Sequence, residues 1–114
     1  MSLSSLTALS PLDGRYAAKV APLRTHFSEF GLIHNRITVE IEWLKALAAE
    51  AAIAEVPTFS PDTITELNEL VANFSEADAE NIKAIERTTN HDVKAVEYFL
   101  RERFSSNPDR KSVV

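Results

Sequence analysis

Cysteine is absent from the sequence, and glycine occurs only twice in 114 residues. Without cysteine there can be no disulfide, no thiolate nucleophile and no cysteine ligand for a metal. Tight hairpins need turn residues such as glycine, and strands need alternating β-branched runs, but the sequence offers only Gly14, Gly31 and no such runs. The scarcity of glycine and the lack of β-branched runs predict an all-α fold.

Basic residues and long apolar runs are also scarce. Lysine and arginine total 12 against 17 acidic residues, and the net charge of −5 gives no general attraction to nucleic acid or anionic lipid. The most apolar stretch, residues 40–55, is interrupted by Glu42, Lys45 and Glu50, so it lacks the roughly 20 uncharged residues of a membrane-spanning helix. We therefore expect no nucleic-acid partner and no membrane anchor.

Length and composition are typical of one globular domain. Hydrophobic residues make up 45% and charged residues 25% of a chain long enough for a modest core. The first twelve residues carry no basic segment and no sustained apolar run, so a secretory signal is not supported and we expect a cytoplasmic protein. We assign the domain to residues 1–104 and a polar tail to residues 105–114.

Apolar spacing predicts about five helices, the longest from Leu32 to about Ala52. One stripe along that helix consists of Ile33, Ile37, Ile41, Leu44 and Ala48. Val39, Trp43 and Leu47 widen the stripe. A helix that is apolar on more than one side packs against several neighbours or against another chain.

Helix start signals define the segments on either side. Pro22 marks a start inside residues 17–30, which we expect to form two short pieces or a kinked helix. Ser60 followed by Pro61 predicts an N-cap and the first position of a helix. The apolar face of this helix would consist of Ile64, Leu67, Val71 and Phe74.

Two further helices are predicted in the last third of the chain. Ser75 would cap one that ends near Arg87, with acidic residues in its first turn. Its buried side would contain Ala79, Ile82 and Ile85. The last helix would cover residues 91–104. Its inward face would contain Val93, Val96, Leu100 and Phe104.

Residues 10–16 (SPLDGRY) interrupt the helical pattern. Pro11 and Gly14 favour a tight turn that would fix Arg15 and Tyr16 just beyond it. A guanidinium and a phenol in this position could hold an anion. The same residue types also suit an ordinary surface turn whose arginine is solvated, and they do not decide between the two.

Residues 87–94 (RTTNHDVK) lie across the break between two predicted helices. With Thr89 or Asn90 as the N-cap, His91 and Asp92 would stand in the first helical turn beside free backbone N–H groups. The helix dipole and the basic residues of this segment would favour a phosphate or carboxylate there and keep His91 neutral. The alternative is a capped helix start in which Asp92 stabilises the dipole and His91 is merely exposed.

The remaining polar residues do not form a metal-binding pattern. His26 and His34 stand apart among hydrophobic neighbours, as surface or half-buried residues do. Glu40 and Glu42 lie on different faces of their helix, which argues against a working carboxylate pair. We expect neither a metal nor a cofactor.

Two strings taken together closely resemble the bacterial adenylosuccinate lyases, which belong to the fumarase and aspartase superfamily. The first consists of residues 4–8 and 10–16, and the second, more specific one is residues 86–97 (ERTTNHDVKAVE). The similarity runs through the intervening helices to about Phe104. The chain therefore looks like the N-terminal helical segment of such an enzyme, without the family's long-helix domain.

The resemblance implies a reaction. The family cleaves adenylosuccinate to AMP and fumarate, and succinylaminoimidazole carboxamide ribotide in the same way, by β-elimination in purine biosynthesis. A base removes a proton next to a carboxylate and an acid protonates the departing nitrogen, so donors must surround three anionic groups of the substrate. The complete enzyme would be a homotetramer built on the long-helix domain.

The resemblance also implies roles for individual residues. Arg15 and Tyr16 would contact the nucleotide end of the substrate, at its phosphate, and Asn90, His91 and Asp92 would line the pocket near the purine and succinyl portions. The family's general acid, a histidine, and its general base, a serine on a mobile loop, belong to later parts of its sequence. The segment would then contain no catalytic residue, with His91 as a candidate auxiliary, and would be inactive alone.

Two other functions are compatible with the residues. One is a free-standing helical interaction module that keeps the scaffold without the chemistry. The other is a different fumarate-releasing lyase, such as argininosuccinate lyase, which would not need Arg15 and Tyr16 for a phosphate. We also expect apolar surface around Ile37, Ile41 and Phe99.

Overall fold

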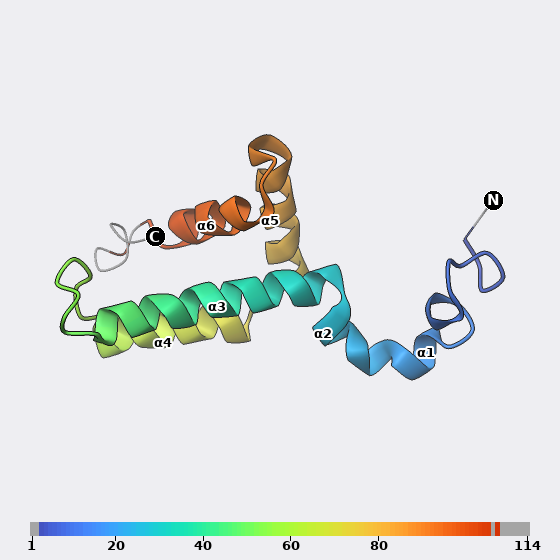
Figure 1. Cartoon of the computed structure of the whole chain (residues 1–114), viewed down its shortest axis with the longest axis horizontal. Helices are drawn as coiled ribbons and strands as arrows, with labels where there is room; N and C mark the ends of the chain where they lie inside the picture. Colours follow the sequence, from blue (N-terminus) through green and yellow to red (C-terminus); the bar gives the residue numbers. More distant parts are fainter. Residues whose placement is uncertain (1–2, 106, 108–114) are drawn as a thin grey trace. The chain divides into compact units, whose positions relative to one another are not determined.

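The computed structural model describes residues 3–105 and residue 107, and this part of the chain contains helices and turns without a strand. The all-α prediction is confirmed. Two 3-10 turns, η1 and η2, and six α-helical segments follow one another as η1 Pro11–Asp13, α1 Ala17–Val20, η2 Ala21–Leu23, α2 Arg24–Phe27, α3 Glu29–Ala49, α4 Pro61–Ala72, α5 Glu76–Thr89 and α6 Asp92–Arg103 (Figure 1). None of these helices is long and apolar enough to cross a membrane. The predicted polar tail, residues 105–114, lies outside the described residues except for Ser105 and Asn107.

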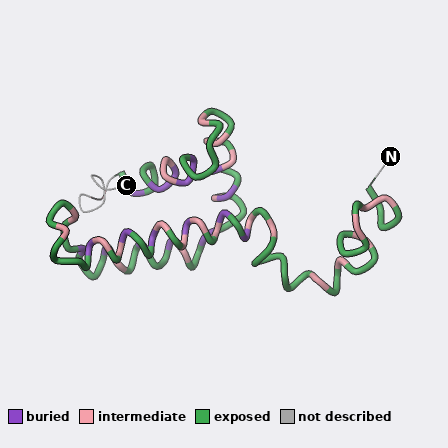
Figure 2. The backbone as a smooth tube through the Cα atoms, viewed as in Figure 1, coloured by how far each residue is buried: buried purple, intermediate pink, exposed green. Residues whose placement is uncertain are grey.

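The chain divides into two compact units, the first ending at Leu32 and the second beginning at Ile33. Among the described residues, all the buried apolar side chains belong to the second unit. They recur along α3 and α6, as Figure 2 shows. This core consists of Ile33, Ile37, Ile41, Leu44, Ala48, Phe59, Leu67, Leu70, Phe74, Ala79, Ile82, Ala95, Val96, Phe99, Leu100 and Phe104.

The first unit consists mainly of short helical pieces. The prediction for residues 17–30 is two short pieces or a kinked helix, and the chain forms three pieces, α1, η2 and α2, before α3 begins at Glu29. Pro22 lies in the first turn of η2, where its missing N–H costs no hydrogen bond. Ser28 ends α2 and begins α3, because its extended backbone breaks the helix and its Oγ accepts the Gly31 N–H at 3.0 Å. A Cβ on Gly31 would lie 2.6 Å from the Thr25 carbonyl oxygen, so the close approach of α2 and α3 requires glycine here.

Helix α3 buries the predicted stripe, and of the residues that widen it Val39 and Trp43 are exposed and Leu47 is half-buried. Ile37 and Ile41 are fully buried, whereas Val39 is 64% and Trp43 61% exposed. The helix ends at Ala49, earlier than the predicted Ala52. The expectation of apolar surface around Ile37, Ile41 and Phe99 is wrong, because these side chains fill the core of the second unit.

Helix α4 begins at the predicted cap, with Ser60 Oγ accepting the Thr63 N–H at 3.2 Å and proline in the first turn. It runs back along α3 (Figure 1), and the His34 ring of α3 lies 2.9 Å from the Val71 carbonyl oxygen. The buried face of α4 differs in part from the predicted one. Ile64 and Val71 are half-buried, and the buried side is completed by Thr63, Leu67, Leu70 and Phe74.

Helix α5 starts with a reciprocal capping box and is tied there to the end of α6. Asp78 donates its N–H to Ser75 Oγ at 3.2 Å, and its carboxylate accepts the Ser75 N–H at 3.1 Å. Arg103 donates to the other carboxylate oxygen of Asp78 at 2.6 Å. Burial alone would raise the pKa of Asp78, but the bonds from Ser75 and Arg103 outweigh it and lower that pKa below its ordinary 3.8.

Helix α6 buries Val96, Leu100 and Phe104 as predicted, together with Ala95 and Phe99. Val93 was predicted to face inward, but its side chain is 37% exposed. Val93 lies in the first turn of α6, two residues after the His91 N-cap.

Asp78 is expected to stabilise the fold at neutral pH and to lose this effect in acid. Its pKa is lower in the folded chain than the ordinary value of 3.8, so the unfolded chain binds more protons as the pH falls through that range. Asp78→Asn should lower the free energy of unfolding by about 1 kcal/mol at pH 7 and flatten its fall between about pH 5 and pH 2. Urea denaturation at a series of pH values measures both effects.

The matched control is Glu69→Gln, because Glu69 is an exposed carboxylate of α4. This variant should keep the acid dependence of the original chain. An Asp78→Asn chain with an unchanged acid dependence would show that the bonds from Ser75 and Arg103 do not stabilise the carboxylate.

Candidate functional site

Residues 10–16 form the predicted turn in the first unit. Pro11 opens η1, and its carbonyl accepts the N–H groups of Gly14 at 3.3 Å and Tyr16 at 2.8 Å. A Cβ on Gly14 would lie 2.8 Å from the Ser5 carbonyl oxygen, so only glycine allows this close approach. The turn is thus fixed by the backbone and leaves the following side chains at the surface.

Arg15 and Tyr16 lie together at the end of this turn. Both are exposed, and the Arg15 guanidinium carbon lies 5.1 Å from the centre of the Tyr16 ring. Within the described part of the chain Arg15 makes no ion pair. A guanidinium that lies over a phenol ring and is not paired with a carboxylate can bind an anion from solution through its N–H groups.

The second predicted segment lies between α5 and α6, and its caps differ from the prediction. Asn90 adopts a left-handed backbone with φ 53° and ψ 31° and ends α5, donating its N–H to the Glu86 carbonyl at 2.8 Å. The N-cap of α6 is His91, neither Thr89 nor Asn90. The reason is that an N-cap residue normally has an extended backbone, and after the left-handed Asn90 the chain first becomes extended at His91.

The His91 ring caps its own helix. Its Nδ1 accepts the Lys94 N–H at 3.0 Å, and the side chain is largely exposed. Accepting this bond requires a lone pair on Nδ1, so the ring is neutral in this arrangement and its proton is on Nε2. The 4.0 Å separation between Nδ1 and the Asp92 carboxylate is therefore not an ion pair. The free Nε2–H is a donor available to a ligand.

Asp92 is held from two sides. Its Oδ1 accepts the Val93 N–H at 2.8 Å, and its Oδ2 lies 2.9 Å from the Arg36 guanidinium of α3. The bond from the Val93 N–H, with the Arg36 charge, lowers the pKa of Asp92 below its ordinary value. The carboxylate is thus ionised and paired.

These bonds change the predicted anion site. The N–H groups of Val93 and Lys94, expected to be free, are taken by the side chains of Asp92 and His91. The Lys94 ammonium pairs with Glu97 at 2.9 Å, and that bond raises its pKa. Among the described residues of this segment, the side chains of Arg87, Asn90 and His91 still offer unpaired donors. A ligand at this segment would therefore meet side-chain donors more than the helix terminus.

Arg36 is the participant that sequence reasoning missed. It lies on α3 beside buried Ile37, and nothing in its local sequence indicates a partner as distant along the chain as Asp92. The contact arises only because the fold brings α3 to the start of α6. Of the predicted site residues, Arg15 and Tyr16 belong to the first unit, and Asn90, His91 and Asp92 to the second.

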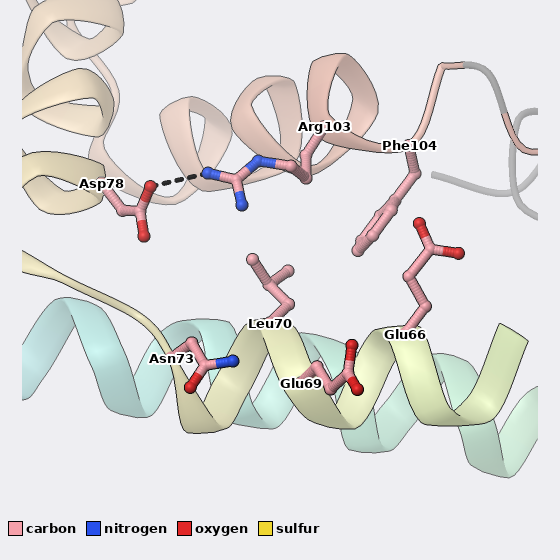
Figure 3. Close-up of a pocket in the computed structure, with 7 residues that line it drawn as sticks. All are labelled: Glu66, Glu69, Leu70, Asn73, Asp78, Arg103 and Phe104. Carbon is pink, nitrogen blue, oxygen red and sulfur yellow. Dashed lines mark hydrogen bonds and ion pairs between the residues drawn. The ribbon is translucent and has the colours of Figure 1, made fainter. Parts of the chain in front are cut away.

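A hollow of about 240 Å³ lies elsewhere in the second unit, among α4, α5 and α6. Figure 3 shows Asp78 and Arg103 bonded at its wall, with Glu66 and Glu69 across from them. Three carboxylates against one guanidinium make this hollow unsuited to an anion. None of the predicted site residues lines it. In the part of the chain that the structure describes, no group of three or more His, Asp or Glu could hold a metal ion.

The sequence pattern of a protein family described as Lyase matches residues 14–113. The chain belongs to the lyase family. Both predicted site segments fall inside this match except for residues 10–13. Membership of the lyase family agrees with the resemblance that the two strings carry.

Similar proteins within the lyase family are named adenylosuccinate lyase. The one from Escherichia coli (strain K12) is 60% identical over 113 residues, which are 99% of this chain and 25% of that protein. The one from Haemophilus influenzae is 63% identical over 106 residues, 93% of this chain and 23% of that protein. The one from Legionella pneumophila (strain Corby) is 48% identical over 114 residues, which are 100% of this chain and 25% of that protein. The chain thus spans about a quarter of the length of these curated relatives.

The left-handed backbone of Asn90 predicts how the chain's stability depends on this residue. Asn90→Gly should leave the free energy of unfolding within about 0.5 kcal/mol of the original, because glycine adopts this backbone freely. Asn90→Ala should lower it by about 1 kcal/mol, because alanine lacks the short polar side chain that lets asparagine tolerate a left-handed backbone. Urea denaturation of the chain measures the difference.

Asn81→Ala is the matched control, since Asn81 is an exposed residue inside α5. This change should be neutral or slightly stabilising, because alanine favours helix more than asparagine does. Equal stability of the Asn90→Ala and Asn90→Gly chains would rule out the left-handed backbone as the reason for asparagine at this position.

Proposed function

We propose that this chain is the N-terminal segment of an adenylosuccinate lyase, which cleaves adenylosuccinate to AMP and fumarate. The same enzyme would cleave succinylaminoimidazole carboxamide ribotide to aminoimidazole carboxamide ribotide and fumarate. The observation that carries the proposal is the similarity of nearly the whole chain to relatives that bear this name. The complete protein is proposed to act on these small molecules in the cytoplasm, as a homotetramer without a cofactor, and to bind neither nucleic acid nor membranes.

The reaction needs positive charge and hydrogen-bond donors at defined places. Adenylosuccinate carries a phosphate and two carboxylates, and charge builds up on one carboxylate when the neighbouring proton is removed. Arg15 has no competing carboxylate partner within the described residues, so we assign Arg15 and Tyr16 to the phosphate. Arginine suits this role because its planar donors match phosphate oxygens.

The turn between α5 and α6 is assigned to the purine and succinyl portions of the substrate. The Asn90 amide can donate and accept, as recognition of a purine edge requires. His91 presents Nε2–H outward because its Nδ1 is occupied by the Lys94 N–H, so it can donate to an oxyanion as an auxiliary. The general acid and the general base are assigned to residues beyond this segment.

The 114-residue chain alone is expected to release no fumarate, whereas the complete protein that carries it should cleave adenylosuccinate. The reason is that the segment supplies substrate contacts but no residue assigned as acid or base. The change in absorbance on cleavage measures both rates. A complete protein without lyase activity would favour the interaction module. Activity of the short chain alone would show that the acid and base lie within it.

Arg15→Ala in the complete protein is expected to weaken use of the phosphorylated substrate. Losing a charged hydrogen bond to phosphate should lower kcat/KM by about 10- to 100-fold. Adenylosuccinate lacking its phosphate, a poorer substrate from the start, should be cleaved equally well by the original protein and by the variant. Steady-state kinetics with both compounds measure this difference.

Arg24→Ala is the control, because Arg24 is another exposed arginine of the first unit, at the start of α2. It should leave kcat/KM for both compounds unchanged. If Arg15→Ala has no effect on the phosphorylated substrate, Arg15 does not bind the phosphate, and a lyase with a substrate that lacks phosphate becomes the better assignment.

A further inference from the structure

Arg36 connects two parts of the second unit that are distant in the sequence. Its guanidinium lies 2.9 Å from Asp92 Oδ2 and joins the first half of α3 to the first residue of α6. The side chain of Arg36 is 29% exposed and that of Asp92 is 50% exposed. The pair thus lies at the edge of the core, with its guanidinium end partly covered.

The support behind Arg36 is rigid. Ile33, Ile37 and Ile41 on the same helix are buried, so the backbone of α3 cannot shift without disturbing the core. Arginine in this position can hold a carboxylate with directed N–H groups, which a lysine holds only as a point charge. The place of the Asp92 carboxylate is therefore set by α3 as well as by α6.

Without Arg36, the negative charge of Asp92 would disfavour the binding of an anionic substrate at the proposed site. Asp92 stands directly after Asn90 and His91, whose side chains have free donors, and it is ionised. An unpaired carboxylate there would repel a ligand that carries a phosphate and two carboxylates. It could also turn toward the His91 ring, whose Nδ1 is 4.0 Å away, and compete with the bond that caps α6.

We propose that Arg36 is a positioning residue for the Asn90–Asp92 turn, which neutralises Asp92 and holds its carboxylate so that His91 and Asn90 face an anionic substrate. This inference rests on the proposed lyase function. Arg36 touches no reacting group and acts through Asp92. The pairing with Arg36 explains how an acidic residue can lie in a site that must attract anions.

The test compares Arg36→Gln and Arg36→Lys in the complete protein by steady-state kinetics with adenylosuccinate. Arg36→Gln should raise KM about tenfold, because the Asp92 carboxylate is then no longer neutralised and repels the anionic substrate, with a smaller effect on kcat. Arg36→Lys should recover part of the loss because it restores the charge. Lys45→Gln is the matched control, since Lys45 is on the same helix, about 13.5 Å further along it, and pairs with Glu42. The control should leave KM unchanged.

A second variant separates action through Asp92 from a direct contact with substrate. Asp92→Asn keeps an oxygen that can accept the Val93 N–H but loses the charge that Arg36 neutralises. In this background, Arg36→Gln should have no further effect on KM. A tenfold rise in KM that persists in the Asp92→Asn protein would overturn the proposal, because Arg36 would then act on the substrate itself.

A failure of this inference and a failure of the proposed lyase function would give different experimental results. If the original complete protein has no lyase activity, the proposed function is wrong. The comparison of KM between the Arg36 variants then gives no result. Carbon-13 NMR of the Asp92 carboxyl in the 114-residue chain then still decides whether Arg36 positions and neutralises it. Arg36→Gln should raise the pH midpoint of this signal and shift the His91 and Lys94 amide signals, and Lys45→Gln should do neither. Unchanged signals in Arg36→Gln would overturn the proposal.

Discussion

Asn90 adopts a left-handed backbone, and this one conformation separates α5 from α6. A helix that continued through Asn90 would carry Ala95, Val96, Phe99 and Leu100 along the axis of α5 and away from the core they fill. The reversal lets α6 pack on α5 and bring its end back to Asp78. It also makes His91 extended, so that its ring can cap α6. The fold of the second unit and the chemistry of the candidate site thus depend on the same residue.

Much of the fold could be predicted from residues whose effect is local. Ser60 and Ser75 cap their helices as expected, because a hydroxyl that accepts a backbone N–H works within one turn. The face of α4 was harder to predict, since Thr63 is polar by composition yet buried. Its hydroxyl lies 3.1 Å from Ser60 Oγ, so it enters the core with a hydrogen-bond partner. Apolar periodicity alone cannot recognise such a residue.

The candidate site was predictable in its residues but not in its bonds. The strings around Arg15 and His91 could be found because their residue types break the helical pattern, and the resemblance to a known family gave them roles. Which residue would cap α6 could not be read from the sequence, because Thr89, Asn90 and His91 compete for that place and one backbone angle decides. The pairing of Arg36 with Asp92 depends on tertiary structure, which short-range spacing does not encode.

The exposed side of α3 has a consequence for spectroscopy. Trp43 is the only tryptophan of the chain, and it points away from the core with Val39 on the same side of the helix. Its indole is therefore largely in contact with solvent in the folded chain, and its fluorescence should change less on unfolding than that of a buried tryptophan. It is instead a sensitive reporter of any surface that comes to cover α3, whether that surface belongs to another copy, to another protein or to a longer form of the same polypeptide.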